Sequence, residues 1–176
     1  MVDVICISGL VGAGKDTVAD KVAKELKFQR VKLSFKDIAK QLNIPLMKYH
    51  EYAEKDMTID IEFDKQIVKE ARKTDSVVST WLGPWQINDA KLRVWLEVSP
   101  EVRAERIAKR DEMTLKEALN HVKKRDFHNR GRYMAIYGID IFDHSVFDLI
   151  INGGNYSADQ VADIIICAYN SKLKKQ

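Results

Sequence analysis

The stretch VICISGLVGAGKDT, residues 4–17, decides the fold of this chain. Its apolar, β-branched start belongs to the run Val2–Ile7, which predicts a strand buried on both faces. The spacing Gly9-x-x-x-x-Gly14-Lys15 matches the core of a phosphate-binding loop (P-loop), and apolar residues at helical spacing predict a helix after it. Glycines in such a loop let backbone N–H groups surround phosphate oxygens, while the helix N-terminus and Lys15 supply positive charge. We therefore expect a nucleotide to bind at this loop.

The predicted nucleotide-binding residues include the whole loop and the start of the helix. They are Gly9, Leu10, Val11, Gly12, Ala13, Gly14, Lys15, Asp16 and Thr17. Asp16 departs from the usual motif, in which Ser or Thr follows the lysine and binds Mg²⁺. Because a carboxylate is also a hard oxygen ligand, Asp16 and Thr17 are candidate Mg²⁺ ligands, directly or through water. Asp16 equally fits a purely electrostatic role at the helix N-terminus, and the sequence leaves both interpretations open.

The rest of the chain predicts alternating strands and helices. Further strands are expected at residues 31–33, 75–79, 92–98 and 147–151. Helix starts are marked by capping patterns at Ser99-Pro100, Thr114-x-x-Glu117 and Ser157-x-x-Gln160. This alternation indicates parallel β-α-β units and therefore a doubly wound α/β sheet flanked by helices. The helical stretches 35–73 and 111–138 are longer than simple crossovers need, so we expect them to be insertions over one edge of the sheet.

Length and composition favour a single domain. The chain has 176 residues, 45% of them hydrophobic, which is enough to bury a sizeable core. A formal net charge of +3 is too mild to indicate nucleic-acid binding, and no apolar run approaches the ~18 residues of a membrane span. Cys6 and Cys167 fit no metal spacing and are predicted to be core residues. With no secretion signal at the N-terminus, we expect a cytoplasmic, monomeric protein.

Six arginines are concentrated in one part of the chain. They are Arg103, Arg106, Arg110, Arg125, Arg130 and Arg132. The first three share a predicted helix face, as do Arg125 and Arg132. Planar guanidinium groups bind phosphate oxygens through two bonds, and phosphoryl transfer needs such groups around the transferring phosphate. The alternative is a solvated basic helix with ion pairs to neighbouring acids, but this density of arginines in a chain with a P-loop favours phosphate binding.

Segments throughout the chain follow a known family pattern. Besides the P-loop, they are Ser34-x-x-Asp37, Asp60 with Asp64, Leu82-x-x-Trp85, residues 100–110, Arg125-Asp126, Arg132-Tyr133, residues 137–141 and residues 143–152. In these segments the chain resembles nucleoside monophosphate (NMP) kinases, and specifically the archaeal-type cytidylate kinases. The resemblance covers nearly the whole chain.

The resemblance implies a P-loop kinase with a five-stranded parallel sheet. Its core would comprise residues 1–34, 75–110 and 139–176, with an NMP-binding helical insert at about 35–74 and a lid at about 111–138. ATP, with Mg²⁺, would occupy the P-loop, and a pyrimidine monophosphate would lie under the insert. Arg106 and Arg110 would lie on the ATP side of the lid hinge.

The resemblance also implies roles for individual side chains. The catalytic residues would be Lys15, Arg110, Arg125 and Arg132, with Arg125 and Arg132 holding the phosphates of both substrates. The substrate-binding residues would be Ser34, Asp37, Lys40, Trp81, Trp85, Arg125, Asp126 and Arg132. Some alternatives stay open. Asp126 equally fits a surface ion pair, the two tryptophans fit either base stacking or the core, and Asp60 with Asp64 fit either a substrate-facing pair or a solvated helix face.

Three departures from the family pattern concern the acceptor and the metal. Lys40 stands where the family commonly has an arginine that contacts the acceptor phosphate. The stretch Ser79-Thr80-Trp81 lacks the acidic and basic residues that the family carries after the third strand, whereas the P-loop gains a carboxylate at Asp16. We hypothesise that the carboxylate which the family carries after the third strand, at the position of Thr80, is replaced in this chain by the carboxylate of Asp16. We call this replacement the carboxylate exchange.

The predicted function is ATP-dependent phosphorylation of a nucleoside monophosphate, CMP or dCMP in the first place, by direct in-line transfer. The departures keep two alternatives open. One is a kinase of another nucleotide or of a small phosphorylated metabolite. The other is a regulatory or assembly factor that binds ATP and turns it over slowly. The predicted partners are therefore small-molecule nucleotides, and neither nucleic acid nor membrane.

Overall fold

The chain folds into a five-stranded parallel sheet between two layers of helices. The computed structural model describes residues 2–33 and 35–174, and its strands have the order β2-β3-β1-β4-β5. The strands are β1 (Val4–Gly9), β2 (Gln29–Val31), β3 (Ser76–Ser79), β4 (Leu92–Glu97) and β5 (Leu149–Asn152). The helices are α1 (Lys15–Leu26), α2 (Phe35–Gln41), α3 (Leu46–Lys55), α4 (Thr58–Ala71), α5 (Gly83–Gln86), α6 (Pro100–Asp111), α7 (Leu115–Tyr137) and α8 (Ala158–Leu173). The predicted parallel sheet is confirmed.

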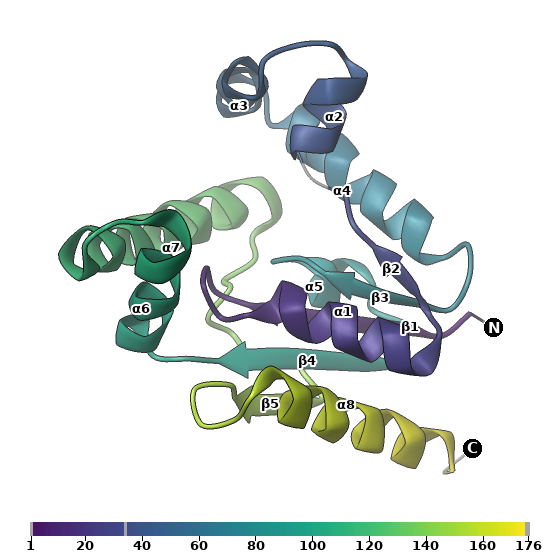
Figure 1. The fold of residues 1–176 in the computed structure, drawn as a ribbon. Helices are drawn as coiled ribbons and strands as arrows, with labels where there is room; N and C mark the ends of the chain where they lie inside the picture. The colour runs from purple at the N-terminus through teal and green to yellow at the C-terminus, as the bar shows by residue number, and fades with distance from the viewer. Residues whose placement is uncertain (1, 34, 175–176) are drawn as a thin grey trace.

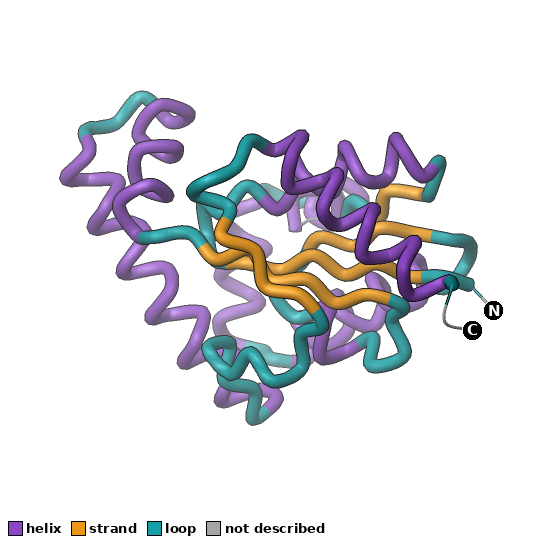
Figure 2. The backbone as a smooth tube through the Cα atoms, turned by 90° about the horizontal axis from the view of Figure 1, so that it is seen from below, coloured by secondary structure: helices purple, strands orange, loops and turns teal. Residues whose placement is uncertain are grey.

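Strand β1 is the centre of the sheet because every one of its residues is buried. It pairs with β3 on one side and β4 on the other, and Ile5 lies opposite both Val77 and Leu92. Helices α1 and α8 cover one face of the sheet, where Ile5, Ile7 and residues of both helices form the largest apolar cluster. Helices α4 and α5 cover the other face, where Cys6 belongs to a second apolar cluster. Figure 2 shows helices on both sides of the sheet.

The sequence predictions for the second strand and for one cysteine were wrong in detail. Strand β2 covers Gln29–Val31 rather than residues 31–33, because Gln29, Arg30 and Val31 are the residues that pair with β3. Leu33 lies beyond the strand, and its apolar side chain packs against the cluster around Cys6. Cys6 is buried as predicted, but Cys167 is exposed on α8.

Two helical segments follow β2 and β4 in the chain and project from the core (Figure 1). One comprises α2, α3 and α4, and we call it the helical insert. The other is the hairpin of α6 and α7, whose second helix begins at the predicted capping box of Thr114 and Glu117. The two segments flank the end of the sheet from which the P-loop emerges. No described helix is long and apolar enough to cross a membrane.

A buried ion pair joins α6, α7 and the P-loop. Arg103 is 2% exposed, its Nη2 lies 2.9 Å from a carboxylate oxygen of Asp126, and it also donates to the carbonyl groups of Val98 and Val11. Arg103 is therefore inside the protein and does not bind phosphate as its helix face predicted. The interpretation of Asp126 as a surface ion pair is also wrong, because its carboxylate is buried against Arg103, whereas its substrate-binding role stays a prediction.

Replacing Arg103 by Met is expected to lower the free energy of unfolding by about 3–5 kcal/mol, because Asp126 would stay buried without its partner. Urea unfolding followed by circular dichroism measures this change. Arg130→Met is the matched control, since Arg130 pairs with Asp140 at the surface and its loss should cost much less. Equal, small losses in the two variants would contradict the assigned role of Arg103.

Candidate active site

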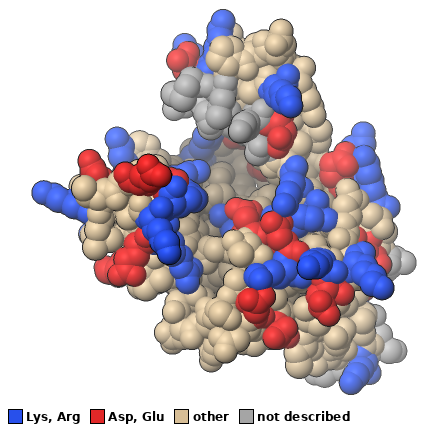
Figure 3. All heavy atoms as spheres, viewed as in Figure 1, with Lys and Arg blue, Asp and Glu red and all other residues tan. Residues whose placement is uncertain are grey.

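A cavity of about 650 Å³ opens at the P-loop. One wall is the loop and the start of α1, from Val11 to Val18. The opposite wall combines residues of α6, α7, the segment between β5 and α8, and the first turn of α8. These residues are Arg106, Ile107, Arg110, Arg125, Gly153, Tyr156, Ser157, Ala158 and Val161. In the space-filling view the molecule is hollowed between the helical insert, the α6–α7 hairpin and the core, and basic side chains lie on both sides of the hollow (Figure 3).

The P-loop takes its shape from glycines and from two arginines of α6. Gly12 and Gly14 have φ values of +79° and +89°, which side chains of L-residues rarely allow. The carbonyl of Val11 accepts a hydrogen bond from Arg103, and the carbonyl of Ala13 accepts one from Arg106 at 3.1 Å. Because C=O and N–H point in opposite directions within a trans peptide, these bonds turn the N–H groups of Gly12 and Gly14 away from the arginines.

Gly9 and Leu10 support the loop from below rather than line the cavity. A side chain at Gly9 would meet Ala13 and the backbone of Leu96 at 3.0 Å, so the strand end and the loop are in close contact there. The Leu10 side chain is buried in an apolar cluster with Leu82 and Trp95. Of the predicted loop residues, those from Val11 to Thr17 face the cavity.

Lys15 begins α1 and is directed toward Trp81. Its Nζ lies 5.6 Å from the centre of the Trp81 ring, and the Trp81 carbonyl accepts a hydrogen bond from Ser8 of β1. Burial lowers the pKa of Lys15, Asp16 opposes this change, and Arg125 and Arg110 reinforce it. The sheet thus brings Trp81 to the cation of the P-loop, where a substrate-binding role remains a prediction.

The other predicted tryptophan, Trp85, packs in an apolar cluster of the core. Trp85 of α5 makes an edge-to-face contact with Phe147 at 5.1 Å, within the apolar cluster that also contains the fully buried Trp95. The core interpretation of Trp85 is therefore favoured over base stacking.

Three arginines reach the cavity from the α6–α7 hairpin. Arg106 donates to the carbonyls of Ala13 and Gly153, and so ties the P-loop to the segment after β5. Arg110 lines the cavity while its guanidinium makes two hydrogen bonds of 2.7 Å to Asp111. Arg125 lines the cavity from α7.

Arg132 faces the helical insert instead of this cavity. Its guanidinium is bound to the carboxylate of Asp60 on α4, which is only 7% exposed, and Nε lies 3.0 Å from the same oxygen. One turn further on α4, Asp64 accepts a hydrogen bond from Tyr137 at 2.6 Å. Burial raises the pKa of Asp64, while hydrogen bonds from Tyr137 and Gln86 oppose this. The interpretation of Asp60 and Asp64 as a solvated face is therefore wrong.

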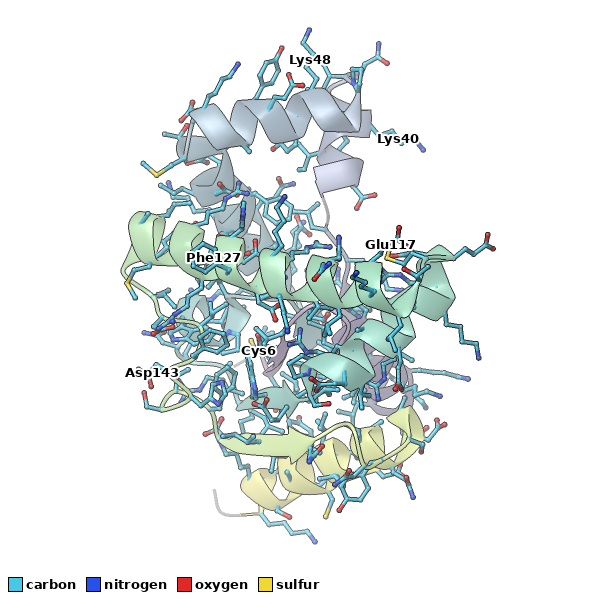
Figure 4. The ribbon with its side chains drawn as sticks, turned by 90° about the vertical axis from the view of Figure 1, so that its left-hand side faces the viewer. Cys6, Lys40, Lys48, Glu117, Phe127 and Asp143 are labelled. Carbon is cyan, nitrogen blue, oxygen red and sulfur yellow. The ribbon has the colours of Figure 1, made fainter. Side chains whose placement is uncertain are left out.

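The remaining predicted acceptor residues lie on or before α2. Asp37 and Lys40 are both exposed on this helix, and the Lys40 side chain extends outward from the insert (Figure 4). Ser34 lies outside the described residues. The roles predicted for these three residues stay predictions.

Asp16 is held at the mouth of the cavity by two side chains. Its carboxylate accepts a hydrogen bond from the Ser79 hydroxyl and another from Arg30, whose Nη2 lies 3.2 Å away. Thr80 is directed elsewhere, since its hydroxyl oxygen accepts a hydrogen bond from the Gly83 N–H at 2.8 Å. Ser79, rather than Thr80, is therefore the residue of this stretch that contacts Asp16, and the carboxylate exchange stays a hypothesis.

A family model now identifies the chain. The model of the cytidylate kinase-like family matches residues 4–155, which include the P-loop, the insert and the hairpin. The chain belongs to this family. The finding agrees with the resemblance inferred from the motifs.

Individual relatives cover nearly all of the chain. It is 38% identical to the cytidylate kinase of Pyrococcus furiosus over 167 residues, which are 94% of this chain and 87% of the relative. It is also 38% identical to the cytidylate kinase of Sulfolobus acidocaldarius, with 96% of this chain and 94% of the relative covered. Among solved structures, shikimate kinase from Acinetobacter baumannii has a TM-score of 0.64 at 15% identity, covering 97% of this chain and 94% of its own. This last likeness concerns the P-loop kinase fold alone.

Several site residues of this cytidylate kinase-like chain escaped the sequence analysis. Gly153, Tyr156 and Ser157 complete the cavity wall, and the capping position of Ser157 was the only signal that this segment had. Arg30 was missed because it precedes the strand predicted at 31–33. Its contact with Asp16 depends on the order of the strands, which local patterns do not reveal.

Gly12→Ala is expected to lower the free energy of unfolding by at least about 1–2 kcal/mol, because an alanine at this position would have to adopt the left-handed backbone conformation. That Cβ would also meet the Arg103 carbonyl oxygen at 2.9 Å. Urea unfolding measures the change.

Gly131→Ala in α7 is the matched control for this substitution. Its Cβ would have no neighbour within 4 Å, so helix propensity should raise stability by about 0.5–1 kcal/mol. The same sign of change in both variants would show that the P-loop backbone does not need Gly12.

Proposed function

We propose that this protein transfers the γ-phosphoryl group of ATP to a nucleoside monophosphate, with CMP or dCMP as the acceptor. The observation that carries the proposal is the convergence of the P-loop, Lys15, Arg110 and Arg125 on one cavity. Phosphoryl transfer depends on positioning and on positive charge around the transferring group, and this cavity supplies both. Membership of the cytidylate kinase-like family supports the choice of acceptor.

The cavity supports a definite orientation of ATP. At one end, Lys15 and Arg125 supply positive charge next to the backbone N–H groups of the loop, and the phosphates fit there. At the other end, Tyr156, Ala158 and Val161 provide an apolar wall that suits a base. Arg106 bridges the two ends through its bonds to Ala13 and Gly153.

The oxygen donors near Lys15 fit Mg²⁺. Asp16 and Thr17 line the cavity, and Ser79 adjoins Asp16. Magnesium in kinases is usually held by one or two carboxylates together with substrate phosphates, so a single carboxylate suffices. Bound there, the ion would neutralise charge on the β- and γ-phosphates. The other role of Asp16, at the helix N-terminus, is compatible with this one.

The acceptor fits between the helical insert, α7 and Trp81. Asp60, Asp64 and Tyr137 form a polar cluster there that is largely shielded from solvent, and Arg132 brings a positive charge to it. Carboxylates accept hydrogen bonds from amino groups, so this cluster favours a base with an exocyclic amine, such as cytosine. Arg132 is free for an acceptor phosphate only when it leaves Asp60, so we expect its pairing to change on acceptor binding.

In the proposed reaction an oxygen of the acceptor phosphate attacks the γ-phosphorus in line with the bond to the leaving ADP. One P–O bond forms as the other breaks, and no enzyme intermediate is needed. Lys15, Arg110 and Arg125 stabilise the charge on the transferring group. Closure of the lid, which we propose to be the segment at about 111–138, would exclude water and suppress ATP hydrolysis.

ADP formation from ATP and Mg²⁺ tests this function, with CMP, dCMP, UMP, AMP, GMP or no acceptor present. We expect strong turnover with CMP or dCMP and little without an acceptor. Equal ADP formation in all reactions, or none in any, would refute the proposed phosphoryl transfer. Turnover with UMP or a purine nucleotide alone would refute the assigned acceptor.

Lys15→Met is expected to lower kcat by ~10²-fold or more, because the transferring phosphate loses a cation placed for the transition state. The unfolding free energy should stay close to that of the wild type. Lys21→Met is the control. It removes a cation from the middle of α1 that pairs with Asp159 of α8, and it should leave turnover unchanged. Wild-type turnover in Lys15→Met would show that this lysine has no part in transfer.

The carboxylate exchange predicts a non-additive pair of substitutions. Asp16→Thr removes the carboxylate from the cavity. Ser79→Glu places a second carboxylate beside Asp16, where the two negative charges repel each other. The double variant keeps one carboxylate, so its kcat/KM at a given Mg²⁺ concentration should exceed the product of the two single effects. Strictly additive effects on the logarithm of kcat/KM would exclude the exchange.

A further inference from the structure

Arg30 of β2 joins the edge of the sheet to the first two turns of α1. Its side chain is only 12% exposed. Nη2 donates to Asp16, Nε donates to Asp20 at 2.9 Å, and Nη1 donates to the carbonyl of Val31. Nη1 also donates to the carbonyl of Val77. A guanidinium held by several acceptors has a defined orientation, because its donors lie in one plane.

Arg30 lies where it can offset the negative charge that Asp16 brings to the P-loop. Asp16 places a negative charge on the wall of a cavity proposed to bind an anion, next to the lysine that should contact the phosphates. An unrestrained Asp16 carboxylate could pair with Lys15 and compete with the nucleotide for it. In the structure the carboxylate instead contacts Ser79 and Arg30, and is 72% exposed.

We propose that Arg30 is a positioning residue for nucleotide binding, which holds the Asp16 carboxylate at the edge of the cavity, offsets its charge and so leaves Lys15 available to phosphate. The inference rests on the proposed function, since it concerns the same P-loop site. It adds a residue from outside the loop, and it explains how this chain tolerates Asp after the P-loop lysine.

Lys32 provides a control within the same ion-pair cluster. Its Nζ lies 3.0 Å from Asp20 and so belongs to the network around Arg30, but its hydrogen bond is to Asp20 and not to Asp16. If the cluster merely fastens β2 to α1, Lys32 and Arg30 should have similar effects. If Arg30 acts through Asp16, the two should differ.

The test is calorimetric titration of ADP, with and without Mg²⁺, into wild-type protein, Arg30→Met, Asp16→Ser, the double variant and Lys32→Met. Arg30→Met should weaken ADP binding by about 10- to 100-fold, the range expected for losing a charge-assisted hydrogen bond. In the Asp16→Ser background the same substitution should change the affinity less than about 2-fold, because no carboxylate remains to be held. Arg30→Lys should restore part of the affinity, and Lys32→Met should change nothing.

Ser79→Ala provides a second test, because it removes the other hold on Asp16 without touching β2. It should weaken ADP binding in the wild-type background and have no effect beside Asp16→Ser. This variant carries the test if Arg30→Met does not fold.

Equal losses of affinity from Arg30→Met in the two backgrounds, or unchanged ADP affinity in both Arg30→Met and Ser79→Ala, would overturn the role of Arg30 while leaving the proposed function intact. Absence of ADP binding to the wild-type protein would overturn the proposed function and this inference together.

Discussion

The active site depends on how α6 holds the P-loop. Arg103 and Arg106 donate to the carbonyls of Val11 and Ala13, so the N–H groups of the same peptides point the other way. An anion-binding loop needs this separation, with carbonyl oxygens bound by the protein and N–H groups directed at the ligand. The burial of Arg103 against Asp126 makes the arrangement rigid, because neither charge can leave its partner at low cost.

The same helices connect the loop to the acceptor region. Helix α7 contributes Asp126 to the buried pair, Arg125 to the cavity, and Arg132 and Tyr137 to the contacts with the helical insert. A movement of α7 therefore acts on both regions at once. The proposed binding of the acceptor at Arg132 would therefore be linked to the donor cavity through α7.

Local sequence patterns were sufficient where the structure is locally determined. The P-loop, the capping box at Thr114 and the buried strand β1 each depend on neighbouring residues, and all were predictable. Helical spacing placed Arg103, Arg106 and Arg110 on one face, but it could not tell which of them lies inside. Arg103 is buried because the start of α6 lies under the Val11 carbonyl, a contact between residues 92 positions apart. Arg30 and Ser79 contact Asp16 because β3 lies next to β1 and β2 lies next to β3 in the sheet. This strand order is a property of the whole sheet and cannot be predicted from local patterns.

Amide chemical shifts of the P-loop during an ADP titration, followed by NMR, test the central claim that the backbone binds the phosphates. The account predicts that the N–H signals of Gly12, Gly14 and Lys15 show the largest changes, and that these changes are lost in Lys15→Met at the same ADP concentration. Large changes elsewhere with unshifted loop signals would contradict it, because the nucleotide would then bind without the loop on which the whole site is built.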